Sequence, residues 1–166
     1  GTYLQAWSNA EQLRVWYQYF LGIRPDMPQK HLTLAPRIPS EIQDLEYSFV
    51  IGNEFCKATY GVRKLGARQY QYELGNQELD VNVDLFPYQP VSVRVTAGSE
   101  LMLAENGKNL IMTVKDPAGR EIQRKKIRKS KSRIKEETEN FSILNGVQFA
   151  KPDALGHHPV IKNTDQ

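Results

Sequence analysis

The chain has 166 residues, of which 40% are hydrophobic and 25% charged, with a net charge of +3 and a mean hydropathy of -0.56. This length corresponds to about one folded domain, and no apolar run reaches the ~20 residues of a transmembrane helix, which excludes that class of protein. A single cysteine excludes an intrachain disulfide framework and a cysteine-rich metal site. Nine prolines and eleven glycines favour a turn-rich, β-rich domain over a helical bundle.

The first residues, Gly1 to Leu4, include no methionine and do not have the basic and apolar regions of a signal peptide. We therefore expect the chain to be a piece of a larger protein or a processed product.

A helix is predicted over Asn9–Leu21. Ser8 and Glu11 form a capping box, in which each side chain can bond the backbone N–H of the other residue. Gly22 and Pro25 favour the end of the helix. The apolar residues recur at the spacing of one helical face: Ala10, Leu13, Trp16, Tyr17, Phe20 and Leu21. Such a wide aromatic face must pack on a large partner, and this short chain cannot supply all of it.

Beyond Pro25 the apolar residues alternate with polar ones, which predicts strands with one buried face. Turn signals such as Gly52-Asn53, Asn106-Gly107 and Asn145-Gly146 separate the strands at intervals of about ten residues. This spacing predicts an antiparallel β-sandwich of eight to ten short strands. The expected strands lie around Leu32–Leu34, Leu45–Ile51, Glu54–Tyr60, Tyr70–Leu74, Leu79–Leu85, Val91–Val95, Leu101–Leu103, Leu110–Val114, Phe141–Leu144 and Val147–Phe149.

The most biased segment contains eight basic residues and no acid: Arg124, Lys125, Lys126, Arg128, Lys129, Lys131, Arg133 and Lys135. One interpretation is an anion-binding surface. The other is a solvated strand pair, which opposes edge-to-edge sheet pairing and is neutralised by Glu136, Glu137 and Glu139. No aromatic residue interleaves the segment, so we predict no nucleic-acid partner.

No catalytic or metal site is predicted from the residues alone. His157 and His158 are adjacent and have no third ligand nearby in sequence, and Cys56 has no neighbouring base. The acidic residues Glu78, Asp80 and Asp84 alternate with apolar ones, as on the solvent face of a half-buried strand. We expect no cofactor.

The N-terminal stretch resembles a known enzyme family. Gln5-Ala6-Trp7-Ser8, followed by Ala10-Glu11-Gln12-Leu13-Arg14, is similar to a motif of the glycogen debranching enzyme (amylo-alpha-1,6-glucosidase) family. The stretch from Leu32 to Pro39 is similar to a segment that follows it in related barrel glycosidases. The resemblance covers residues 1 to 60 and fades afterwards.

The resemblance implies that the helix is the last one of an (α/α)6 catalytic barrel that this chain otherwise lacks. The catalytic acidic pair of the family lies in that barrel, with its later Glu before the position of Gly1. Glu11 does not inherit this role, since the capping box explains it. Gln5 and Trp7 match the family motif and would lie near the sugar pocket of the intact enzyme, where an indole stacks on a pyranose and an amide bonds its hydroxyls. The alternative for Trp7 is core packing.

The expected organisation is therefore a barrel helix and linker over residues 1–28, a β-sandwich over 29–150 and a loose tail over 151–166. We expect a non-catalytic C-terminal fragment of a debranching-type α-glucosidase, whose partners are the missing barrel and, through the parent enzyme, α-glucan. The helix would fold onto its own sandwich or self-associate through the Trp16 face. No membrane partner is expected, and a cytoplasmic location is slightly favoured.

Two rival functions are retained. The first is an autonomous carbohydrate-binding module in which Tyr70 and Tyr72 are exposed and stack on glycan. The second is an anion-binding adaptor that uses residues 124–135.

Overall fold

A computed structural model describes residues 6–39 and 41–135. The chain divides into two units, residues 1–130 and 131–166. All described strands belong to the first unit. In the second unit, the structure describes one helical segment over residues 131–135.

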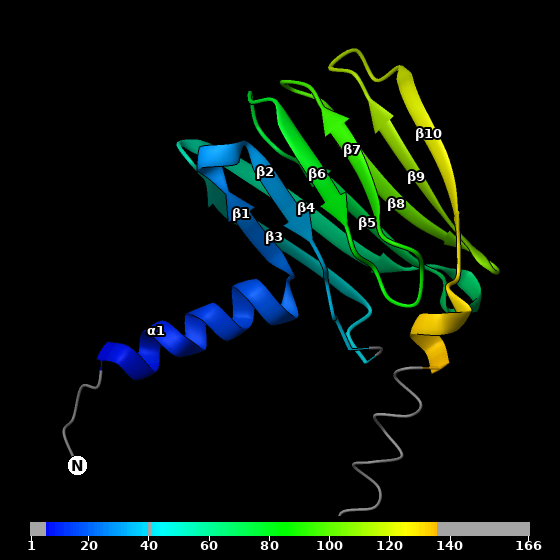
Figure 1. Cartoon of the computed structure of the whole chain (residues 1–166), viewed down its shortest axis with the longest axis horizontal. Helices are drawn as coiled ribbons and strands as arrows, with labels where there is room; N and C mark the ends of the chain where they lie inside the picture. Colours follow the sequence, from blue (N-terminus) through cyan, green and yellow to red (C-terminus); the bar gives the residue numbers. More distant parts are fainter. Residues whose placement is uncertain (1–5, 40, 136–166) are drawn as a thin grey trace, which may run out of the picture. The chain divides into compact units, whose positions relative to one another are not determined.

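The described residues of the first unit form a helix followed by ten strands (Figure 1). The helix is α-helical over Ala6–Arg14 (α1) and π-helical over Val15–Phe20 (η1), which confirms the predicted helix with a start three residues earlier. The strands are β1 (Ile23–Asp26), β2 (His31–Leu34), β3 (Asp44–Ile51), β4 (Glu54–Val62), β5 (Arg68–Glu73), β6 (Leu79–Val83), β7 (Val91–Val95), β8 (Glu100–Asn106), β9 (Asn109–Lys115) and β10 (Glu121–Arg128). Short 3-10 turns are η2 (Met27–Gln29) and η3 (Lys64–Gly66).

Two sheets form the unit, one of four strands in the order β1-β2-β6-β7 and one of six in the order β10-β9-β8-β5-β4-β3. The prediction of a mainly β fold with one N-terminal helix is confirmed. One feature of the antiparallel prediction is wrong, because β2 and β6 pair in parallel, with Leu32 beside Val81. A parallel pair needs a long crossover, and here residues 35–78 provide it through three strands of the other sheet.

A single apolar core lies between the sheets. Leu32 and Val81 from the four-stranded sheet and Tyr72, Leu101 and Leu103 from the six-stranded sheet are each 0% exposed. Alternate residues of β3, β6, β8 and β9 are buried as the period-two pattern predicts.

Three local predictions need correction. Pro25 was expected only to end the helix, but it lies in β1, an edge strand, where a missing N–H is tolerated. The hairpin turn predicted at Asn106-Gly107 lies one residue later, at Gly107-Lys108, because Asn106 pairs with Asn109 at the ends of β8 and β9. The expected strand pair over residues 124–135 is one strand, β10, while residues 131–135 are helical. The acids expected to neutralise it and the last predicted hairpin, 141–149, lie outside the described residues.

Candidate docking surface and neighbouring sites

The base of the N-terminal helix is fixed to the four-stranded sheet. The carbonyl of Phe20 accepts a hydrogen bond from the Arg37 N–H (3.0 Å), and the carbonyl of Gly22 accepts one from Ala35 (2.8 Å). Gly22 has a φ of +69°, and a Cβ there would lie 2.1 Å from the carbonyl carbon of Ala35. Only glycine fits this close approach, so the sequence itself sets the point at which the helix leaves the sheet.

Beyond this base the helix carries large apolar side chains that stay exposed in the described part of the chain. Trp16 is 56% exposed, Tyr19 52%, Leu13 61% and Tyr17 39%, whereas Phe20 is half-buried and packs on the core. The expectation that the helix folds onto its own sandwich is therefore wrong for Trp16 and Tyr17. Within the part of the chain that is described, only the last turn reaches the core.

Local contacts order this exposed surface. The rings of Trp16 and Phe20 pack edge to face with centroids 4.9 Å apart. The Arg24 Nε donates to the Gln18 carbonyl at 3.0 Å, and its guanidinium lies 5.5 Å from the centre of the Tyr19 ring. A π-helical segment such as η1 is rare and is frequently found at functional sites. We name the side chains of Leu13, Trp16, Tyr17 and Tyr19 the aromatic helix surface.

The two residues assigned to a sugar pocket from the family motif remain predictions. Gln5 lies outside the described residues, and Trp7 lies in the first turn of α1.

Two acidic residues in and beside β6 lie near the same arginine. Glu78 and Asp80 are exposed, as predicted for a solvent face, whereas Asp84 is half-buried. Glu78 and Asp80 share one cation: the Arg94 Nε lies 2.7 Å from Glu78 and its Nη1 4.0 Å from Asp80. The hydrogen bond from Arg94 lowers the pKa of Glu78. Acid catalysis of glycoside hydrolysis needs a carboxyl whose pKa is raised, which is the opposite of the shift at Glu78.

Neither a metal-binding cluster nor an activated cysteine occurs among residues 6–39 and 41–135. No group of three or more His, Cys, Asp or Glu side chains there could hold a metal ion. His31 lies in β2, and the predicted pair His157-His158 lies outside the described residues. Cys56 is fully buried, and burial raises the pKa of its thiol, so it is a small core residue as expected.

Sequence reasoning missed a polar cluster at one end of the sandwich. Glu105 accepts a bidentate pair from Arg68, with Nη2 at 2.7 Å and Nε at 3.1 Å, and a hydrogen bond from the Tyr88 hydroxyl at 3.1 Å. Burial alone would raise the pKa of Glu105, but the hydrogen bonds and charge of Arg68 lower it below its ordinary value. The signal was available, because Glu105 continues the inward alternation of Leu101 and Leu103 on β8. We interpret this cluster as structural.

The basic segment is partly engaged within the first unit. The Lys125 Nζ crosses from β10 to the carbonyl of Ser92 on β7 (2.9 Å), and Arg124 lies 3.5 Å from Glu121. Lys129 lies over the Tyr88 ring at 5.8 Å. Since β10 is the edge of the six-stranded sheet, its charges suit protection of that edge against pairing.

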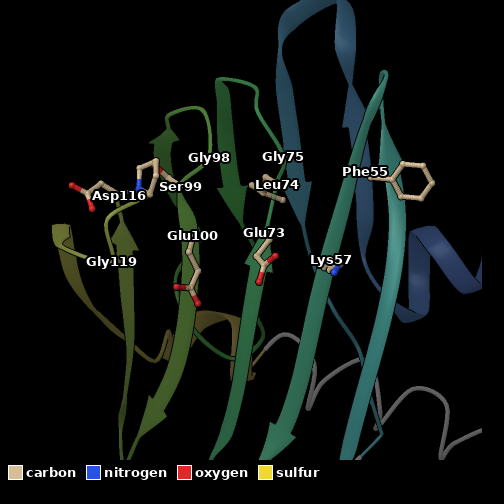
Figure 2. A pocket seen from close by; sticks show the side chains of 11 residues that line it. Phe55, Lys57, Glu73, Leu74, Gly75, Gly98, Ser99, Glu100, Asp116 and Gly119 are labelled. Carbon is tan, nitrogen blue, oxygen red and sulfur yellow. The ribbon is translucent and has the colours of Figure 1, made fainter.

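The outer face of the six-stranded sheet is hollowed near the end at which β4 and β8 begin and β5 and β9 end (Figure 2). This hollow has a volume of about 350 Å³, and Figure 2 shows Glu73 and Glu100 on neighbouring strands between Asp116 at one end and Phe55 at the other. The Asp116 carboxylate already accepts bonds from the Arg120 side chain and from two backbone N–H groups of its own turn.

Comparisons with known proteins add no identification. The chain matches no family model, no curated protein and no solved structure. No helix in the described part of the chain is long and apolar enough to cross a membrane.

Proposed function

We propose that this chain is the C-terminal accessory region of a debranching-type α-glucosidase and braces the catalytic barrel through its aromatic helix surface. The observation that carries the proposal is the exposure of Trp16, Tyr17 and Tyr19 on a helix whose base is fixed by Gly22. Trp and Tyr side chains dominate the energy of protein interfaces, because they bury a large area at low entropic cost.

The resemblance of the same helix to the debranching family supports a specific partner. In this proposal α1 and η1 complete an (α/α)6 barrel, and the sandwich follows it. The barrel supplies both catalytic carboxylates, so the parent hydrolyses α-glucosidic linkages while this chain alone is silent. Gln5 and Trp7 would face the sugar pocket of the assembled enzyme.

A carbohydrate-binding module that uses Tyr70 and Tyr72 is contradicted by the structure. Tyr70 and Tyr72 are 1% and 0% exposed, because they point between the sheets, and neither ring can stack on a glycan. The anion-binding adaptor finds less support than docking, since Lys125 and Arg124 already have partners.

The docking test joins this chain with the polypeptide encoded immediately before Gly1. We expect the two to associate when co-expressed, and we expect hydrolysis of branched α-glucan only by the complex. Trp16→Asp should abolish association, whereas Phe55→Asp, at a still more exposed aromatic position on β4, should not. Association that survives Trp16→Asp contradicts the proposal. So does a Trp16-dependent dimer of the isolated chain that excludes the preceding polypeptide.

A second measurement addresses catalysis. The isolated chain should not hydrolyse α-glucosides. Turnover that disappears in Glu78→Gln, Asp80→Asn or Asp84→Asn would overturn the accessory role.

A further inference from the structure

The outward-facing side chains of β4 and β5 are unusually varied for one side of a sheet. On β4 the buried Cys56, Ala58 and Tyr60 alternate with outward residues, and on β5 Tyr70 and Tyr72 do the same. The outward residues are Phe55, Lys57 and Thr59 on β4, and Gln69, Gln71 and Glu73 on β5. One exposed aromatic ring therefore shares a face with an ammonium group, a hydroxyl, amides and a carboxylate.

Two hollows on this face share lining residues. The larger, of about 350 Å³, includes Phe55 and Glu100, and the smaller, of about 160 Å³, includes Thr59 and Gln71. Lys57 and Glu73 line both. The larger hollow crosses from β4 over β5 to the start of β8, and the smaller extends along β4 and β5 toward Thr59; we call the two together the groove. The larger alone has the size of a small-ligand site.

The charged groups in this groove are not paired with one another. Glu73 lies opposite Lys57 on one side and Glu100 on the other. Among the described residues neither carboxylate comes within 4.0 Å of a cationic group, and the ammonium group of Lys57 also has no ion pair there. Glu73 and Glu100 repel each other, while Lys57 and Lys115 occupy the cross-strand positions on their other sides. None of these groups closes an ion pair within 4.0 Å with a described residue, so acceptors and donors stay open to a ligand.

These groups suit a neutral polyol better than an ion. A carboxylate accepts from hydroxyl groups, an ammonium group donates to them, and an amide does both. Phe55 is 79% exposed, and an aromatic face packs on the apolar face of a sugar ring. A phosphate would be repelled by the two carboxylates. A metal ion would need three or more ligands, and no described group of His, Cys, Asp or Glu side chains provides them.

We propose that this groove binds a neutral oligosaccharide. Phe55 stacks on one sugar ring, while Glu73, Glu100 and Lys57 bond its neighbours' hydroxyls and Gln71 extends the contact along the groove. The choice of an α-linked glucan as ligand rests on the proposed function. The binding of a neutral oligosaccharide in the groove does not depend on it. In the parent enzyme this site would hold a polymer near the barrel without taking part in hydrolysis.

The test is an NMR titration of this chain with maltoheptaose, with cellohexaose as the β-linked control. We expect millimolar or tighter binding of maltoheptaose, with shifts at Phe55, Gln71 and Glu73. Phe55→Ala and Glu73→Gln should each weaken it by about tenfold. Tyr19→Ala, which removes an exposed aromatic ring from the helix, is the matched control and should leave binding unchanged. Both test positions are exposed, so their variants should fold, which the melting temperature verifies.

Absence of saturable binding overturns the inference, as does binding that Phe55→Ala and Glu73→Gln leave intact. Equal affinity for cellohexaose overturns the assignment of an α-linked ligand. The variants separate this inference from the proposed function, because Phe55→Ala leaves barrel docking untouched and Trp16→Asp leaves glucan binding untouched. Absence of glucan binding therefore contradicts only this inference, and absence of barrel docking contradicts only the proposed function.

Discussion

The sandwich interior and the N-terminal helix are built from the same kinds of side chains and meet opposite fates. Tyr72 and Leu103 are 0% exposed, whereas Trp16 is 56% and Leu13 61% exposed. The difference is not one of hydrophobicity. Each sheet faces another sheet, so its inward residues lose their water, while the helix meets the core only at Phe20. An apolar pattern therefore shows that a face is fit for burial, and a partner decides whether burial occurs.

The largest expected effect comes from a matched pair of leucines. Leu103→Ala should lower the free energy of unfolding by about 2–5 kcal/mol, because it leaves a cavity in a close-packed core. Leu13→Ala should change it by less than about 0.5 kcal/mol, as expected for an exposed position. Urea unfolding measures both. A comparable cost for the two would show that the helix has a partner within this chain.

The polar cluster should make the sandwich sensitive to acid. The pKa of Glu105 is lower in the folded chain than its ordinary value of 4.5. Its contribution to stability is therefore complete above that value and is lost as the pH falls through the folded pKa. Glu105→Gln should cost about 1–3 kcal/mol at neutral pH, since it removes a charge partner of half-buried Arg68.

The pH dependence identifies the cause. The stability of Glu105→Gln should fall less than that of the wild type between neutral and acidic pH, as followed by thermal melting. Glu78→Gln is the control, because its pair with Arg94 is solvent-exposed and should contribute little. A wild-type-like acid response in Glu105→Gln would exclude Glu105 as its source.

A smaller effect tests the helix directly. Trp16→Ala in this chain should reduce stability by at most about 1 kcal/mol, because more than half of the side chain is already in water. In complex with the preceding polypeptide the same change should cost about 3–5 kcal/mol, the value for a buried Trp. Equal costs in the two settings would remove the argument for a docking surface.

The smallest effect is expected at the basic edge. Joint replacement of Arg124, Lys126 and Arg128 by Gln should change stability little, since exposed ion pairs contribute about 0–1 kcal/mol each. The variant should aggregate faster if these charges protect the edge of β10. Salt-sensitive, micromolar binding of the unmodified chain to nucleic acid would instead favour an anion-binding role.

Local patterns in the sequence determined much of the molecule. The alternation of apolar and polar residues predicted β3, β6, β7, β8 and β9, because successive side chains of a strand with one buried face point alternately to the core and to water. Gly22 placed the end of the helix, because the close backbone approach admits only glycine there. The predicted capping box is wrong, since α1 begins at Ala6, before Ser8, and Glu11 lies 3.4 Å from Arg14 instead. The same alternation could have buried Tyr70 and Tyr72, which lie in phase with Leu74, and could have placed Glu105 inside with Leu103.

Other features were decided only by the tertiary structure. The parallel pairing of β2 with β6 joins residues almost fifty positions apart, and no local pattern specifies which strand becomes a neighbour. Pro25 stops a helix and also fits an edge strand, so its role depended on β2 lying beside it. The exposed helix and the groove beside Phe55 arise in the same way. The sequence determines which faces are apolar or polar, but only the packing of distant strands determines which of those faces remain in contact with water.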